Sequence, residues 1–120
     1  MNPLNYATRE ASKRLYNAGI ALETDAVWLK PCERLQWMLH TRMLCGVRMD
    51  LSQHCIPAPS MAEVWRELPE YSRVYKQQGL YMAWLEYNIG NEGKLSNIFE
   101  NSNLADALID LLIWVRNEKV

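Results

Sequence analysis

A short segment near the middle of the chain, bounded by proline on both sides, restricts the fold more than any other feature. Pro57 and Pro59 precede Ser60, and Pro69 follows. Ser60 and Glu63 have the spacing of a capping box, in which each side chain accepts a hydrogen bond from the other residue's backbone amide. Because proline lacks an amide hydrogen and clashes with the preceding turn, the helix has to end at Pro69. The residues at helical spacing predict an apolar face formed by Met61, Val64, Trp65 and Leu68.

Two further helices are predicted near the ends of the chain. Small and apolar residues recur at helical spacing over Leu4–Ala18, and Gly19 is placed to end that helix in a left-handed conformation. Asn103 is an N-cap candidate for a helix over Leu104–Asn117. That last helix is apolar on almost every side, so we expect other elements to cover it on both flanks.

The intervening segments indicate short strands. Within Asp25–Lys30 the run Ala26–Leu29 is apolar and rich in strand formers. Over Leu35–His40, Leu35, Trp37 and Leu39 recur at every second position, the spacing of a half-buried strand. We favour a strand pair joined by Pro31–Arg34, although a helix over Glu33–Leu44 also fits the spacing. A second hairpin is predicted further on, from a strand over Leu80–Asn88, a turn at Gly90–Gly93 and a returning strand over Lys94–Glu100. The patterns over 45–56 and 70–79 assign no element.

The element order is therefore α-β-β-α-β-β-α, an α+β fold with about three helices packed on a small, mostly antiparallel sheet. No linker or repeat divides residues 1–120, so we expect a single domain. The chain is 49% hydrophobic and 22% charged, which excludes wholesale disorder.

Three segments together resemble a family of short proteins found in bacteriophages and integrated prophages. They are Ala11–Ile20 with Glu23, Thr24 and Trp28, then Ile56–Trp65 ending in Leu68 and Pro69, and finally Ala105–Trp114. The resemblance covers both ends and the middle of the chain, and 71–102 matches only loosely. It implies a small cytoplasmic accessory protein of a mobile element. The family brings no catalytic motif, so no functional residue is carried over from it.

All the cysteine and histidine residues lie within one stretch of the sequence. Cysteine thiolates and histidine nitrogens are good ligands for zinc, which takes four of them in a tetrahedron. The same residues could form a nucleophilic thiol with an imidazole partner. Their spacing matches no standard zinc site, so we expect no cofactor and keep zinc as the alternative. The stretch contains Cys32, His40, Cys45, His54 and Cys55.

Two pairs of acidic residues have the spacing of neighbours on one helix face. Glu63 and Glu67 belong to the capped helix, and Asp106 and Asp110 to the last one. In a cleft, such pairs can bind metal or act as acid and base. We expect solvated stripes instead, since acidic residues are favoured in the first turns of a helix.

The aromatic residues give the strongest indication of function. The chain holds five Trp and six Tyr, more than so small a core hides completely, and both residues are enriched at protein interfaces. Trp65 and Trp114 fit core positions on helices. The candidate binding surface on the second hairpin consists of Tyr81, Trp84 and Tyr87.

The sequence as a whole favours an interaction protein over an enzyme. With 13 basic and 14 acidic residues and a net charge of −1, a nucleic-acid partner is disfavoured. No segment has the length and apolarity of a membrane span, and three cysteines suit a reducing compartment. We therefore expect a cytoplasmic protein that binds a protein partner or forms a homodimer.

Overall fold

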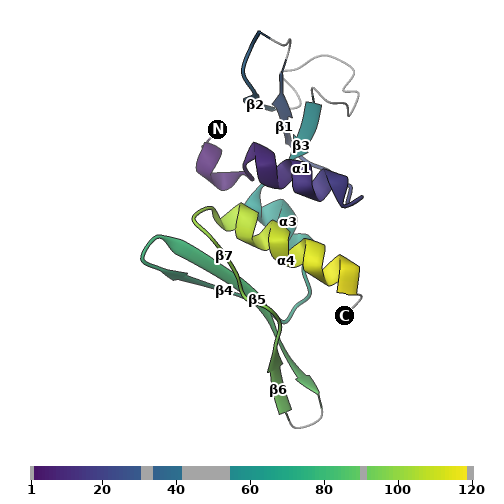
Figure 1. The fold of residues 1–120 in the computed structure, drawn as a ribbon, viewed down its shortest axis with the longest axis vertical. Helices are drawn as coiled ribbons and strands as arrows, with labels where there is room; N and C mark the ends of the chain where they lie inside the picture. Colours follow the sequence, from purple (N-terminus) through teal and green to yellow (C-terminus); the bar gives the residue numbers. More distant parts are fainter. Residues whose placement is uncertain (1, 31–33, 42–54, 90–91, 119–120) are drawn as a thin grey trace.

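The computed structural model of the chain describes residues 2–30, 34–41, 55–89 and 92–118 (Figure 1). The α+β class expected from the sequence is confirmed. The described elements are a 3-10 helix η1 (Pro3–Asn5), the helices α1 (Arg9–Asn17), α3 (Met61–Glu67) and α4 (Leu104–Glu118), and the strands β1 (Ala26–Leu29), β2 (Met38–Thr41), β3 (Cys55–Ala58), β4 (Ser72–Gln77), β5 (Leu80–Ile89), β6 (Glu92–Leu95) and β7 (Phe99–Asn101).

The strands form two antiparallel sheets, where the sequence predicted one. The first sheet has the strand order β2-β1-β3. In the second sheet, strand β5 pairs with β4 along one edge and with β6 and β7 along the other. Figure 1 shows the sheets toward opposite ends of the long axis, with α1, α3 and α4 between them. The molecule is accordingly elongated, with extents of 55 × 31 × 22 Å.

The first helix is shorter than predicted. It begins at Arg9, because Thr8 has an extended backbone and its hydroxyl accepts a hydrogen bond from the amide of Ala11 at 3.3 Å. Leu4 therefore lies outside α1 and is 75% exposed. Gly19 follows the helix with a φ of 78°, the left-handed conformation predicted for it.

The first strand pair is confirmed, although most of its predicted connection lies outside the described residues. The alternative helix over Glu33–Leu44 is contradicted within the described residues 34–41, where Met38–Thr41 forms strand β2. β1 and β2 are antiparallel, with Trp28 opposite Leu39. Strand β3, which the sequence patterns do not predict, pairs with the other edge of β1 and contains Pro57. Proline is tolerated there because β3 is an edge strand, whose outward positions need no amide hydrogen.

The proline-bounded helix forms as predicted, with both hydrogen bonds of the capping box present. Val64 and Leu68 are buried in the core. The predicted core position of Trp65 is wrong, because this residue remains 45% exposed. On so short a helix the apolar stripe is wider than the surface that α4 covers.

The second sheet is built on a hairpin whose second strand, β5, was predicted and whose first strand, β4, lies in the segment 70–79, to which the sequence patterns assign no element. β4 and β5 are joined by Gln78 and Gly79, both with positive φ (51° and 80°), as in the two-residue turns that match the twist of paired strands. The returning strand predicted over Lys94–Glu100 is divided into β6 and β7. A one-residue bulge separates them, where the Ser96 hydroxyl accepts a hydrogen bond from the amide of Leu85 at 2.8 Å.

Helix α4 lies at the centre of the core, in agreement with its apolar sequence. It packs against α1, α3, β5 and β7. The amide of Asp106 donates to the Asn103 side chain at 3.1 Å, which is the predicted N-cap. The helix residues that are almost completely buried are Ala105, Ala107, Leu108, Ile109, Leu111 and Leu112.

Candidate functional site

One side of the β4–β5 hairpin faces away from the helices (Figure 1). Tyr75 lies opposite Met82, and Trp84 and Leu80 occupy the same side because side chains alternate along a strand. Tyr75 is 53% and Leu80 is 44% exposed, whereas Met82 and Trp84 are half-buried. These four apolar and aromatic residues, which we call the open face, share that side of the hairpin with Arg73, opposite Trp84, and Gln77, opposite Leu80.

The structure separates the three aromatic residues that the sequence singled out on β5. Trp84 belongs to the open face. Tyr81 lies on the other side of the strand with Ala83 and Leu85, where it packs against the core, and the Lys76 ammonium lies 5.3 Å from its ring centre. Tyr87 is part of β5, but its side chain lies outside the described residues.

A second apolar feature adjoins the hairpin on its helical side. A groove of about 320 Å³ opens between α3, β4 and the start of α4. Its rim includes Trp65 and Val74, which are 45% and 36% exposed. All of the lining side chains are apolar, namely Met61, Ala62, Trp65, Val74, Leu104 and Leu108. Such a groove accepts apolar side chains and offers no group for acid–base chemistry.

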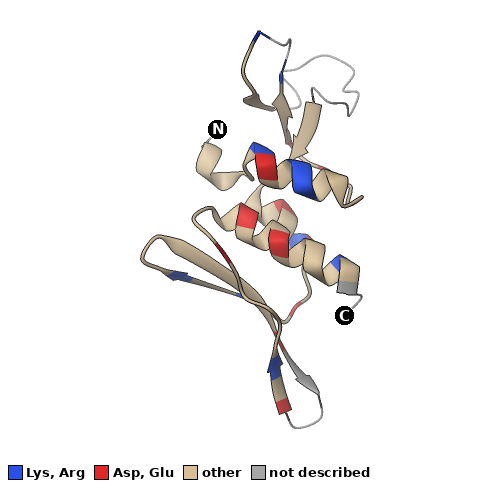
Figure 2. Cartoon of the chain, viewed as in Figure 1, with Lys and Arg blue, Asp and Glu red and all other residues tan. Residues whose placement is uncertain are grey.

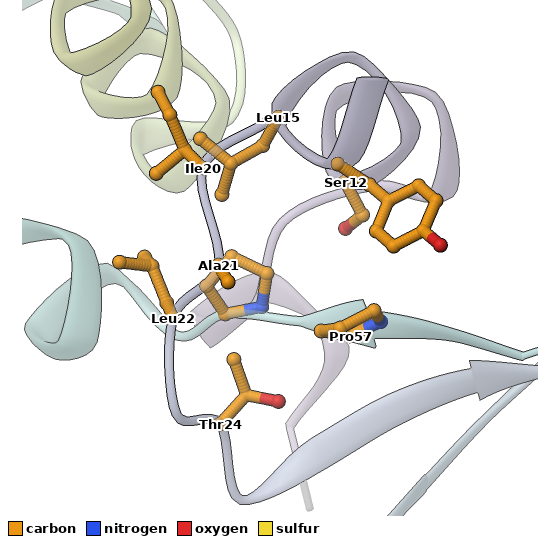
Figure 3. Close-up of a pocket in the computed structure, with 9 residues that line it drawn as sticks. Ser12, Leu15, Ile20, Ala21, Leu22, Thr24 and Pro57 are labelled. Atoms are coloured by element: carbon orange, nitrogen blue, oxygen red, sulfur yellow. The ribbon is translucent and has the colours of Figure 1, made fainter. Parts of the chain in front are cut away.

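A smaller pocket lies between α1, the segment 20–24 that precedes β1, and Pro57 and Pro59 in and after β3 (Figure 3). The hydroxyl of Ser12 is turned toward the space between Leu15, Ala21 and Pro57. Ser12 is 1% exposed, and its oxygen has no hydrogen-bond partner among the described residues. The pocket volume of about 50 Å³ is well below the several hundred Å³ of a metabolite site. Water molecules fit it better than a substrate.

Of the cysteine and histidine cluster, only two members fall within the described residues. His40 lies opposite Val27 and Cys55 lies opposite Leu29, so β1 separates them. At ordinary strand spacing and rise their Cα atoms are roughly 12 Å apart. Cys55 is buried, and no group of three or more potential metal ligands occurs in the described part of the chain. The remaining members of the cluster lie outside it, namely Cys32, Cys45 and His54.

The expectation of a solvated stripe is wrong for Glu63 of the first acidic pair. Glu63 is 7% exposed, and its two carboxylate oxygens accept from the amides of Ser60 at 2.8 Å and Asp25 at 3.0 Å. It therefore ties the start of α3 to the start of β1. Glu67 is half-exposed and forms an ion pair with Arg116 at 3.2 Å, so for this residue the expected position on the surface is confirmed.

Asp106 of the second pair is also buried, at 4% exposure. Burial raises its pKa above the ordinary value of 3.8, against the opposing effects of hydrogen bonds from Thr8 and the positive charge of Arg14. Asp110 remains half-buried and pairs with Arg14 at 2.8 Å. The two carboxylates serve helix packing, and neither lies in the groove or the small pocket.

The charged side chains form no one-sided field among the described residues. Figure 2 shows basic and acidic residues distributed over several elements, and one pair across the helices joins Arg14 of α1 to Asp110 of α4. No helix in the described ranges is long and apolar enough to cross a membrane. The described surface is therefore distinguished by its apolar features and not by a basic tract.

Sequence reasoning missed Tyr75 and Val74, which lie on β4. Val74 and Tyr75 are both of residue types that favour strands. They are followed by Gln78–Gly79 and a second strand, and this order is a hairpin signal that could have identified them. Trp65 was recognised as part of an apolar stripe, but its place on the rim of a groove depends on β4. Comparisons of this chain with protein-family models, with curated proteins and with solved structures find no match.

Proposed function

We propose that this chain is a small cytoplasmic accessory protein of phage or prophage type that acts by binding protein, either another protein or a second copy of itself. The open face carries the proposal. It presents Tyr75, Leu80, Met82 and Trp84 on the side of the second sheet that faces away from the helices. Aromatic residues and methionine are enriched where proteins meet, and tyrosine and tryptophan bury much area with little loss of conformational entropy.

The groove supports the same function. Trp65 and Val74 on its rim are apolar and half-exposed. Strand β4 contributes Val74 to the groove on one side and Tyr75 to the open face on the other. Two apolar features on one hairpin let a partner bury more surface than either alone offers. The near-neutral charge argues against a nucleic-acid partner, which would need a basic groove.

A photo-cross-linking experiment tests this function. The full chain is produced in bacterial cells with a benzophenone amino acid in place of Met82, on the open face, or in place of Lys13, which is exposed on α1. Covalent adducts of defined mass are expected from position 82 and not from position 13. Adducts of twice the chain mass would identify self-association, and other masses a protein partner. Equal labelling at both positions, or none at 82, would contradict the proposal.

A further inference from the structure

One edge of β4 carries backbone groups that bond to no strand among the described residues. The amide of Glu86 donates to the carbonyl of Tyr71 at 2.9 Å. Because hydrogen-bonded pairs alternate along an antiparallel ladder, Arg73, Tyr75 and Gln77 bond to β5. The amide and carbonyl groups of Val74 and Lys76 therefore point toward the outer edge.

Ser72 is the next residue whose backbone points to that edge, but its groups are already engaged. Its amide donates to the carbonyl of Pro69 at 3.0 Å, and its carbonyl accepts from Arg73 Nη1 at 3.0 Å. At the other end, Gln78 belongs to the turn. The edge thus offers a ladder of two residues, Val74 and Lys76, with Tyr75 between them.

We infer that a second copy of this chain adds its own β4 to this edge, antiparallel, with Tyr75 of each copy opposite Tyr75 of the other. The inference deepens the proposed function and rests on it. In this register Val74 of each copy faces Lys76 of the other, and the four residues exchange four backbone hydrogen bonds. A register centred on Val74 would need the groups of Ser72, which are engaged. A register centred on Lys76 would need the turn residue Gln78.

The side chains agree with a second copy as the occupant. Arg73 would lie opposite Gln77 and Lys76 opposite Val74, so no like charges meet across the new pair, and the net charge of −1 adds little repulsion. The apolar stem of Lys76 would extend over the rim of the neighbouring groove beside Val74. On the open face, Met82 and Tyr75 of one copy would continue into Tyr75 and Met82 of the other, which would cover Tyr75, a residue that is 53% exposed.

Disulfide cross-linking tests the register. Directly opposed residues of a non-hydrogen-bonded pair have Cα atoms about 4.5 Å apart, within the range of a disulfide. A Tyr75→Cys chain is therefore expected to form an intermolecular 75–75 disulfide under mild oxidation, identified by mass spectrometry of linked peptides. Arg73→Cys is the matched control on the same strand and face, because the two copies of position 73 would be roughly 13 Å apart.

We expect at least tenfold more 75–75 than 73–73 linkage. Equal yields at the two positions would overturn the inference, since they would report random collision. Preferential linkage of a Val74→Cys chain would overturn the register.

A proline substitution tests the backbone ladder itself. Val74→Pro removes an amide hydrogen from the outer edge and leaves the bonds between β4 and β5 in place. The wild-type chain is expected to give a dimer mass under native conditions and Val74→Pro a monomer with an unchanged circular dichroism spectrum. Val74→Ile, which keeps the amide, should remain a dimer.

A dimeric Val74→Pro chain or a monomeric wild-type chain would overturn the inference. The experiments distinguish a failure of the strand pairing from a failure of the proposed protein-binding function. If the wild-type chain is a monomer but benzophenone at position 82 still captures another protein, only the strand pairing fails.

Discussion

Asp106 accepts two hydrogen bonds from Thr8, one from its backbone amide at 2.8 Å and one from its hydroxyl at 2.7 Å. Thr8 is the N-cap of α1, and Asp106 lies in the first turn of α4. The pair therefore joins the N-termini of two helices from opposite ends of the chain. The negative charge of Asp106 also lies near both helix N-termini, where it is favourable.

Replacing Asp106 with alanine is expected to lower the free energy of unfolding by about 2–3 kcal/mol, because the Thr8 amide and hydroxyl lose a charged acceptor. Asp110→Ala is the matched control, one turn along the same helix, and should cost less than about 1 kcal/mol because it removes a partly exposed ion pair. Urea unfolding of both variants measures the difference. Equal losses would show that the Thr8 contact contributes no more than the surface pair.

The pH dependence of stability follows from the same residue. Burial is the main cause that raises the pKa of Asp106 above 3.8, so the folded state holds this proton more firmly than the unfolded state. The resulting contribution to stability is complete below pH 3.8 and is lost as the pH rises through the raised pKa. The stability of the wild-type chain relative to Asp106→Asn should therefore decrease over that interval. Chemical unfolding at a series of pH values would show the opposite slope if the hydrogen bonds from Thr8 outweighed burial.

Ser12→Ala is expected to leave the stability of the chain unchanged or to raise it by about 1 kcal/mol. The substitution removes a buried hydroxyl that has no partner among the described residues, and alanine has the higher helix propensity. Ser60→Ala is the matched comparison, because the Ser60 hydroxyl caps α3 and its loss should cost about 1 kcal/mol. Thermal unfolding of the two variants measures the contrast. A clear loss of stability in Ser12→Ala would indicate an ordered water bound to the hydroxyl.

Glu63→Gln is expected to destabilise the fold by about 1–2 kcal/mol, whereas Glu67→Gln should change it by less than about 0.5 kcal/mol. The amide of glutamine retains one acceptor oxygen, so either the Ser60 or the Asp25 amide loses its bond. Glu67 loses only an exposed pair with Arg116. Both variants are measured by urea unfolding, and a similar effect of the two would contradict the structural role of Glu63.

Much of the local structure could be predicted from the sequence. The capping box at Ser60 and Glu63, the end of the first helix at Gly19 and the cap at Asn103 depend on residues close in the chain, and all three form. The first hairpin was predicted for the same reason. β3 was missed because its strand contains Pro57, a residue that weakens any strand pattern and is tolerated only at an edge.

The candidate site was only partly predictable. Alternation along β5 places Trp84 on one side and Tyr81 on the other, but it does not reveal which side the helices cover. Only the packing of α4 against β5 leaves Trp84 on the open face and turns Tyr81 toward the core. The groove likewise exists because β4 lies beside Trp65 of α3, a contact between different elements that no local pattern records.

The sequence by itself determined which residues begin and end helices and which alternate in strands, since those preferences act between residues a few positions apart. The tertiary structure decided which carboxylates are buried, which side of β5 is covered and which edge of β4 stays open. These outcomes depend on contacts between segments distant in the chain, such as Thr8 with Asp106 and Asp25 with Glu63. A one-dimensional pattern carries no information about which of two equivalent faces a distant helix will cover.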